Sequence, residues 1–125
     1  MAVTVDPAQT VAFLHRREAA RQRELDGRFE TAWGEFHRIV EMIAGEFTPR
    51  RIWQWGSLLH RPRFSERSDI DIALEGLGSA ERLFQVYARA EELSTFPLDI
   101  VELERIEPEY AHLIRTSGRL VHGDR

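Results

Sequence analysis

Two aspartates, Asp69 and Asp71, stand two residues apart in a stretch where polar and apolar residues alternate. The alternation over residues 68–74 predicts a β-strand, in which both carboxylates project on the same side. Neighbouring carboxylates repel each other unless a cation lies between them, and Mg²⁺ prefers such oxygen ligands. Because Mg²⁺ fills its remaining positions with water and phosphate oxygens, the pair indicates a phosphorylated substrate. For the pair taken alone, a solvated strand edge is the alternative.

A glycine and a serine, Gly56 and Ser57, directly follow another predicted strand at residues 51–55. Glycine lets the backbone approach a phosphate closely, and the N–H groups after it, together with the Ser57 hydroxyl, can donate to phosphate oxygens. A plain turn that caps a helix is the alternative for this dipeptide.

A third acidic residue, Asp99, lies inside the otherwise apolar strand predicted at residues 98–103. An unpaired carboxylate in such a strand is costly if it is buried. If this strand lies beside residues 68–74, Asp99 joins Asp69 and Asp71 as a metal ligand and as the base that takes a proton from an attacking hydroxyl. An exposed acid on an edge strand is the alternative.

A long helix is predicted ahead of these strands. Asp6 is suited to be its N-cap and Pro7 its first residue, and apolar residues recur every three or four positions over residues 25–43. Pro49 ends the helix, since a proline disfavours helical geometry in the residue before it. Gly27 either divides this segment into two helices or lies inside one long helix.

Two more helices separate and follow the later strands. Ser79 can cap a helix that ends before Pro97, and Pro108 opens a last helix that Gly118 separates from a short strand at residues 119–122. Three apolar residues of the last helix are expected to face inward: Tyr110, Leu113 and Ile114. The order of elements predicts an α/β (α+β) fold with a small mixed sheet covered by helices.

Size and composition limit the possible functions. A chain of 125 residues fits one domain, which we divide into an N-terminal helical segment at residues 1–46 and a catalytic core at residues 47–125. A net charge of −4 and a pI near 5.7 argue against an extended nucleic-acid surface. All 17 basic residues are arginine and cysteine is absent, which excludes lysine and thiolate chemistry.

The location of the protein is also predicted from composition. The first ten residues lack the basic start and apolar stretch of a secretory signal. No apolar run approaches the roughly 20 residues that a membrane helix needs. We therefore expect a cytoplasmic protein without a membrane partner.

Together these motifs resemble the nucleotidyltransferase superfamily that includes DNA polymerase β, and specifically its minimal stand-alone members. The matching segments are residues 56–57, 68–72 and 98–101, and residues 114–123 are similar to the closing helix, turn and strand of that family. The resemblance spans about residues 40–123 and implies a polymerase-β-like fold with a long N-terminal helical extension.

The resemblance also implies roles for individual residues. The catalytic acids, which hold two Mg²⁺ ions, would be Asp69, Asp71 and Asp99, and the nucleoside triphosphate would bind at Gly56 and Ser57 with Ser68 nearby. Many minimal members continue after the glycine and serine with Ala-Arg-Gly, whereas this chain has Leu-Leu-His at residues 58–60. Arg61 or Arg63 is expected to replace the displaced arginine at the phosphates, because a guanidinium pairs well with phosphate oxygens. Solvated loop charges are the alternative.

The same resemblance implies an activity and a partner. Minimal members pair with a HEPN-type ribonuclease toxin and act as its antitoxin, and some transfer AMP from ATP to a tyrosine of that toxin. We therefore expect a protein adenylyltransferase that uses ATP and Mg²⁺, with the N-terminal helix as a candidate partner-binding element. The alternative is a nucleotide-binding, catalytically weak module that inhibits its partner by direct contact.

Overall fold

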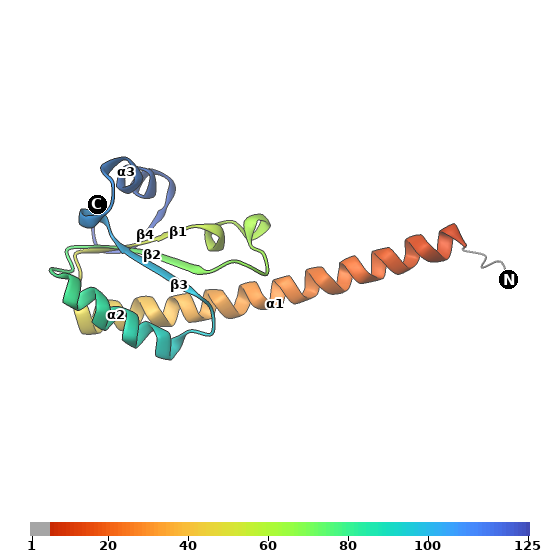
Figure 1. The fold of residues 1–125 in the computed structure, drawn as a ribbon, viewed down its shortest axis with the longest axis horizontal. Coiled ribbons are helices and arrows are strands. Elements are labelled where there is room, and N and C mark those ends of the chain that lie inside the picture. The colour runs from red at the N-terminus through yellow and green to blue at the C-terminus, as the bar shows by residue number, and fades with distance from the viewer. Residues whose placement is uncertain (1–5) are drawn as a thin grey trace.

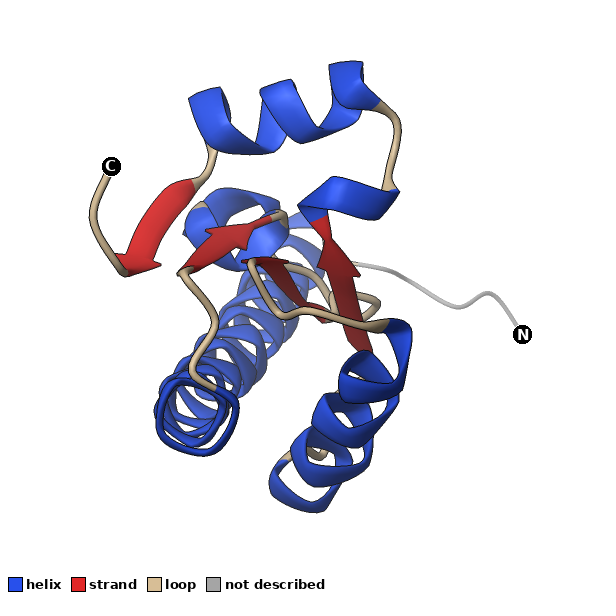
Figure 2. Cartoon of the chain, turned by 90° about the vertical axis from the view of Figure 1, so that its left-hand side faces the viewer, coloured by secondary structure: helices blue, strands red, loops and turns tan. Residues whose placement is uncertain are grey.

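The computed structural model describes residues 6–125 and places helices on both faces of a four-stranded sheet (Figures 1 and 2). Residues 1–5, which begin the stretch expected to carry no leader, lie outside the described residues. The elements in chain order are α1 (Pro7–Phe47), β1 (Arg51–Trp55), β2 (Ile70–Glu75), α2 (Ala80–Leu93), β3 (Leu98–Glu102), α3 (Pro108–Ser117) and β4 (Arg119–His122). The expected mixed α/β class is confirmed.

The strands lie in the order β3-β2-β1-β4. β1 is antiparallel to β2 and β4, whereas β2 and β3 are parallel and are joined through α2. The strand that carries Asp99 therefore lies directly beside the strand that carries Asp71, which is the condition that the sequence left open.

The first helix is continuous through Gly27 and contains 41 residues, about 60 Å at 1.5 Å per residue. The side chain of Asp6 accepts a hydrogen bond of 3.0 Å from the N–H of Ala8 at its start. The helix ends at Thr48, whose left-handed backbone precedes Pro49, so the helical segment runs one residue past the expected boundary at residue 46. Its N-terminal half projects beyond the rest of the molecule (Figure 1).

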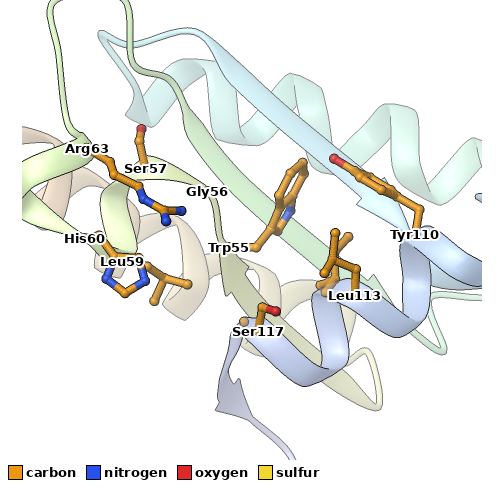
Figure 3. Close-up of a pocket in the computed structure, with 11 residues that line it drawn as sticks. Trp55, Gly56, Ser57, Leu59, His60, Arg63, Tyr110, Leu113 and Ser117 are labelled. Atoms are coloured by element: carbon orange, nitrogen blue, oxygen red, sulfur yellow. The ribbon is translucent and has the colours of Figure 1, made fainter.

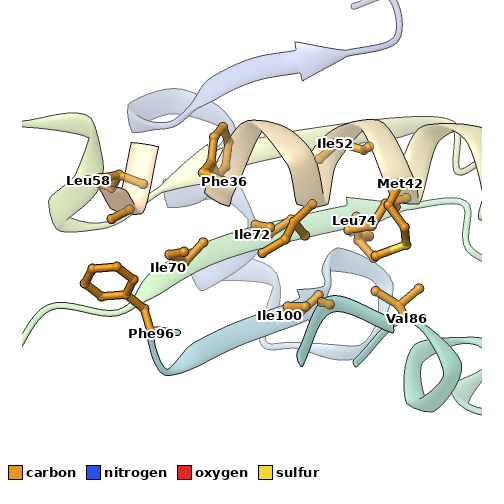
Figure 4. Close-up of a cluster of buried hydrophobic side chains, with 14 of the residues drawn as sticks. Phe36, Met42, Ile52, Leu58, Ile70, Ile72, Leu74, Val86, Phe96 and Ile100 are labelled. Carbon is orange, nitrogen blue, oxygen red and sulfur yellow. The ribbon is translucent and has the colours of Figure 1, made fainter. Parts of the chain in front are cut away.

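Two layers of apolar side chains hold the sheet. α1 and α2 cover one face, where Phe36 of α1 and Val86 of α2 pack against Ile72 of β2 (Figure 4). α3 covers the other face, where Ile114 packs with Trp53. None of the helices in residues 6–125 combines the length and apolar character needed to cross a bilayer.

The expectation for α3 was only partly right. Ile114 is buried, but Tyr110 and Leu113 are 41% and 54% exposed. These two side chains share a helical face with Ile114 and overhang the end of β1 at Trp55, where the sheet beneath them stops (Figure 3).

A buried acid fixes α3 over the sheet. The carboxylate of Glu75, at the end of β2, accepts hydrogen bonds from Arg115 of α3 at 3.1 Å and from the Trp53 indole at 2.8 Å. Arg50 and Arg51 also pair with it. Burial alone would raise the pKa of Glu75, but the hydrogen bonds from Arg115, Trp53 and Arg50 outweigh it and hold this pKa below its usual value. α3 is therefore anchored at the end of β2 opposite to Asp71.

Candidate active site

The three acidic residues meet where β1 ends and where β2 and β3 begin. Asp71 pairs in register with Asp99 on one side and with Trp55 on the other. Asp69 lies one residue before β2, and its carboxylate is within hydrogen-bonding reach of Asp71. The predicted strand began two residues too early, because Ile70 is the first residue of β2, and its N–H donates to Pro97 at 2.9 Å. The three acids are nevertheless neighbours, although within residues 6–125 they do not form the three-ligand metal site expected from the sequence.

The gathered charges shift the protonation of two of these acids. Asp71 is only 6% exposed. Its burial, the charge and hydrogen bond of Asp69 and the charge of Asp99 raise its pKa to about 8. Burial and the charge of Asp69 also raise the pKa of Asp99. Asp71 therefore holds a proton near neutral pH unless a cation takes that place.

The turn after β1 contacts this cluster directly. Gly56 has φ of +85°, and a Cβ atom added to it would lie 2.0 Å from Oδ2 of Asp71. Only glycine allows the turn to come so close to the carboxylate. The Ser57 hydroxyl donates to the Ser68 hydroxyl at 2.8 Å, and that oxygen also accepts from the N–H of Ser65 at 2.9 Å. Ser68 therefore connects the turn to the loop before β2. The Ser57 hydroxyl, which is expected to donate to phosphate, donates to Ser68 instead.

The two candidate phosphate-binding arginines point to different places. Arg61 pairs with Glu30 of α1, and its guanidinium lies over the ring of Phe29 at 4.5 Å. It is therefore directed to the long helix and does not line the cavity beside the turn. Arg63 does line that cavity, together with Gly56 and Ser57.

A cavity of about 350 Å³ adjoins the turn on the side of α3 (Figure 3). Its walls are mostly apolar and come from β1, the turn and α3: Trp55, Leu59, Tyr110, Leu113 and Ile114. The rings of Trp55 and Tyr110 meet edge to face, with centroids 5.6 Å apart. The Tyr110 hydroxyl points away from α3, and burial and the charges of Asp99 and Asp71 raise its pKa. The cavity therefore adjoins the carboxylates at Gly56, which lines it and lies against Asp71, but none of the three aspartates lines the cavity itself.

The donor set fits Mg²⁺. Within residues 6–125, no three His, Cys, Asp or Glu side chains are already arranged around one point as metal ligands. Mg²⁺ requires fewer protein ligands, because it commonly takes one or two carboxylates and completes its coordination shell with water and phosphate oxygens. Asp69 and Asp71 offer two such carboxylates, and a cation would relieve the repulsion that raises the pKa of Asp71.

Comparison with known proteins gives no match to this chain among protein-family models, curated proteins or solved structures. The functional interpretation therefore depends on the motifs and on the geometry of the site.

The sequence alone assigns no functional role to two residues of this apolar wall, Tyr110 and Leu113. Tyr110 and Leu113 were expected in the core, and their spacing with Ile114 does mark one helical face. Spacing along a helix cannot show where the sheet below it ends. Their position at the cavity depends on how α3 lies on the sheet.

Proposed function

We propose that this chain is a Mg²⁺-dependent nucleotidyltransferase of the cytoplasm that transfers AMP from ATP to a hydroxyl group. Its acceptor would be a tyrosine of a HEPN-type ribonuclease toxin, for which the chain would act as antitoxin. The observation that carries the proposal is the meeting of Asp69, Asp71 and Asp99 beside a turn that only glycine can form. Clustered carboxylates beside a phosphate-binding turn suit phosphoryl transfer, which requires mainly positioning and charge neutralisation.

Each residue of the site would have a separate role in this reaction. The acceptor oxygen attacks the α-phosphorus of ATP, its proton passes to Asp99, and the bond to the β-phosphate breaks so that pyrophosphate leaves. The raised pKa of Asp99 makes it a better proton acceptor than an ordinary aspartate. Gly56, Ser57 and Arg63 would hold the leaving phosphates. Bound Mg²⁺, held by Asp69 and Asp71, supplies charge neutralisation at the phosphates.

The projecting half of α1 has features that support the proposal of a protein partner. Val11, Phe13 and Leu14 are about half-exposed there, at 49%, 55% and 52%. Arg16 and Arg17 follow them on the same helix. Exposed apolar side chains next to basic residues suit a partner surface that is apolar with acidic neighbours.

One observation favours a second candidate function, inhibition of the partner by contact without transfer. Arg61, one of the two arginines expected at the phosphates, is held by Glu30 instead. The remaining grip of Gly56, Ser57 and Arg63 could then bind nucleotide with little turnover.

Transfer of label from α-³²P ATP tests the proposal. The protein, Mg²⁺ and a lysate of the source cells are mixed, and wild type is compared with Asp69→Asn. The matched control is Asp124→Asn, since Asp124 is exposed and lies at the far end of the chain. We expect one labelled protein with wild type and control, and none with Asp69→Asn.

A double variant distinguishes inhibition by AMP transfer from inhibition by contact alone. If Asp69→Asn combined with Asp71→Asn still binds and neutralises the toxin, contact alone is sufficient and the transfer proposal is wrong. If that double variant binds the toxin but no longer neutralises it, the contact-only candidate is excluded.

A further inference from the structure

The cavity beside the turn has the size and lining of a small-molecule site. Its volume of about 350 Å³ lies within the range of roughly 300–1,000 Å³ usual for ligand pockets. Its lining is mainly apolar, and its polar residues are Ser57, His60 and Arg63 at the turn and Ser117 on α3 (Figure 3). Such a lining suits a flat, weakly polar ring rather than an ion or a sugar.

Two wall residues are exposed although they are apolar. Tyr110 and Leu113 keep 41% and 54% of their surface in solvent, while their neighbours Ala111 and Ile114 are buried. Packing within the chain therefore does not explain why large apolar side chains stand at these two positions. A planar ring placed against both side chains would remove that apolar surface from water.

The turn after β1, at Gly56 and Ser57, forms one side of the same cavity. Gly56, Ser57 and Arg63 line it together with the apolar wall. One molecule with phosphates at one end and an aromatic ring at the other would therefore occupy both parts at once. A nucleoside triphosphate has this construction.

We propose that the cavity binds the nucleobase of the nucleoside triphosphate, with Tyr110 and Leu113 as its outer wall. This inference rests on the proposed function, because it places the base of the nucleotide whose phosphates meet the turn. The wall contains no charged side chain, so it would grip the faces of the base through apolar contact.

Calorimetric titration with Mg²⁺ present tests this inference, with ATP and inorganic tripolyphosphate as the two probes. We expect wild type to bind ATP about tenfold more tightly than tripolyphosphate. Leu113→Ala and Tyr110→Ala should remove most of this difference while leaving the affinity for tripolyphosphate unchanged. Both residues are exposed, so both variants should fold. Phe84→Ala is the matched control, since Phe84 is 77% exposed on α2 across the sheet.

The outcomes separate this inference from the proposed function. If ATP and tripolyphosphate bind wild type equally well, the phosphate site stands and the nucleobase inference is wrong. If Leu113→Ala slows transfer without weakening ATP binding, the cavity holds the aromatic side chain of the acceptor, which also overturns the inference. If wild type binds neither probe, the proposed function and the inference fail together.

Discussion

The α-carbon of Gly56 lies against the carboxylate of Asp71, so that a methyl group on Gly56 would sit 2.0 Å from Oδ2. Gly56 also has φ of +85°, a conformation that other residues adopt only with strain. The end of β1 and the start of β2 are thus joined at a contact that requires glycine. The turn after β1 and the carboxylate of Asp71 are therefore positioned together.

Replacement of Gly56 by alanine should break this contact. The strained backbone and the clash with Asp71 should lower the free energy of unfolding by about 1–3 kcal/mol, measured by urea denaturation. The proposed transfer of AMP should be lost as well. Gly27→Ala is the matched control, because nothing lies within 4 Å of the added methyl group. Inside α1 it should raise stability by about 0.5–1 kcal/mol. A Gly56→Ala protein with wild-type stability would contradict the close contact.

Asp71 should make the metal-free protein less stable as the pH rises. Its folded pKa of about 8 lies above the ordinary value of 3.8. Between these values the folded state binds more protons than the unfolded state, so stability falls from about pH 4 to pH 8. Asp71→Asn carries no charge and should remove this loss, raising stability at pH 8 by about 1 kcal/mol or more. Melting temperatures at pH 5 and pH 8 without metal test this, and a variant that is no more stable than wild type at pH 8 would disprove it.

Added Mg²⁺ should reverse the same effect. A cation at Asp69 and Asp71 competes with the proton on Asp71, so it should raise the melting temperature more at pH 8 than at pH 6. Asp71→Asn should abolish most of this rise. Equal Mg²⁺ effects in wild type and variant would place the ion elsewhere.

The gathering of the acids was predictable only in part from local rules. The alternation of a strand cannot by itself place both carboxylates of the pair, because Asp71 lies in β2 whereas Asp69 lies one residue before it. Two adjacent residues, Gly56 and Ser57, do mark a turn directly after a strand. The place of Asp99 depended on which strands pair. β2 and β3 are joined by one helix, which commonly makes such strands parallel neighbours.

The directions of long side chains were not predictable. Arg61 and Arg63 stand two residues apart in one loop, yet Arg61 meets Glu30 of α1 and Arg63 lines the cavity. Glu30 is 31 residues away in the sequence, and no local pattern connects it to Arg61. Whether α1 continues through Gly27 was also not predictable from the sequence. The cost of one glycine inside a helix is small, so the outcome depends on helix propensity together with the packing of the C-terminal half of α1.

Glu75→Gln should loosen α3 and with it the wall of the cavity. The substitution removes the charge that pairs with Arg115, Arg50 and Arg51 and should destabilise the protein by about 2 kcal/mol at pH 7. The pKa of Glu75 is lowered in the folded state, so its contribution is present above the ordinary value of 4.5 and is lost on acidification. The difference in stability between wild type and variant, measured by urea denaturation, should therefore shrink from pH 7 to pH 3. An unchanged difference would show that charge pairing at Glu75 is not what anchors α3.

The two halves of α1 should differ in amide hydrogen exchange. Residues 32–43 pack on the sheet through Phe36, Ile39 and Ile43, whereas the outermost described ion pair between α1 and the rest of the fold is that of Arg21 with Glu66. A helix without tertiary packing is marginal in water. The amides of residues 8–20 should therefore exchange at least about a hundredfold faster than those of residues 32–43. If the proposed toxin partner binds this half of α1, its addition should slow exchange in residues 8–20 selectively. Equal protection in both halves of the isolated protein, unchanged on dilution, would contradict an unpacked N-terminal half and remove it as the partner-binding element.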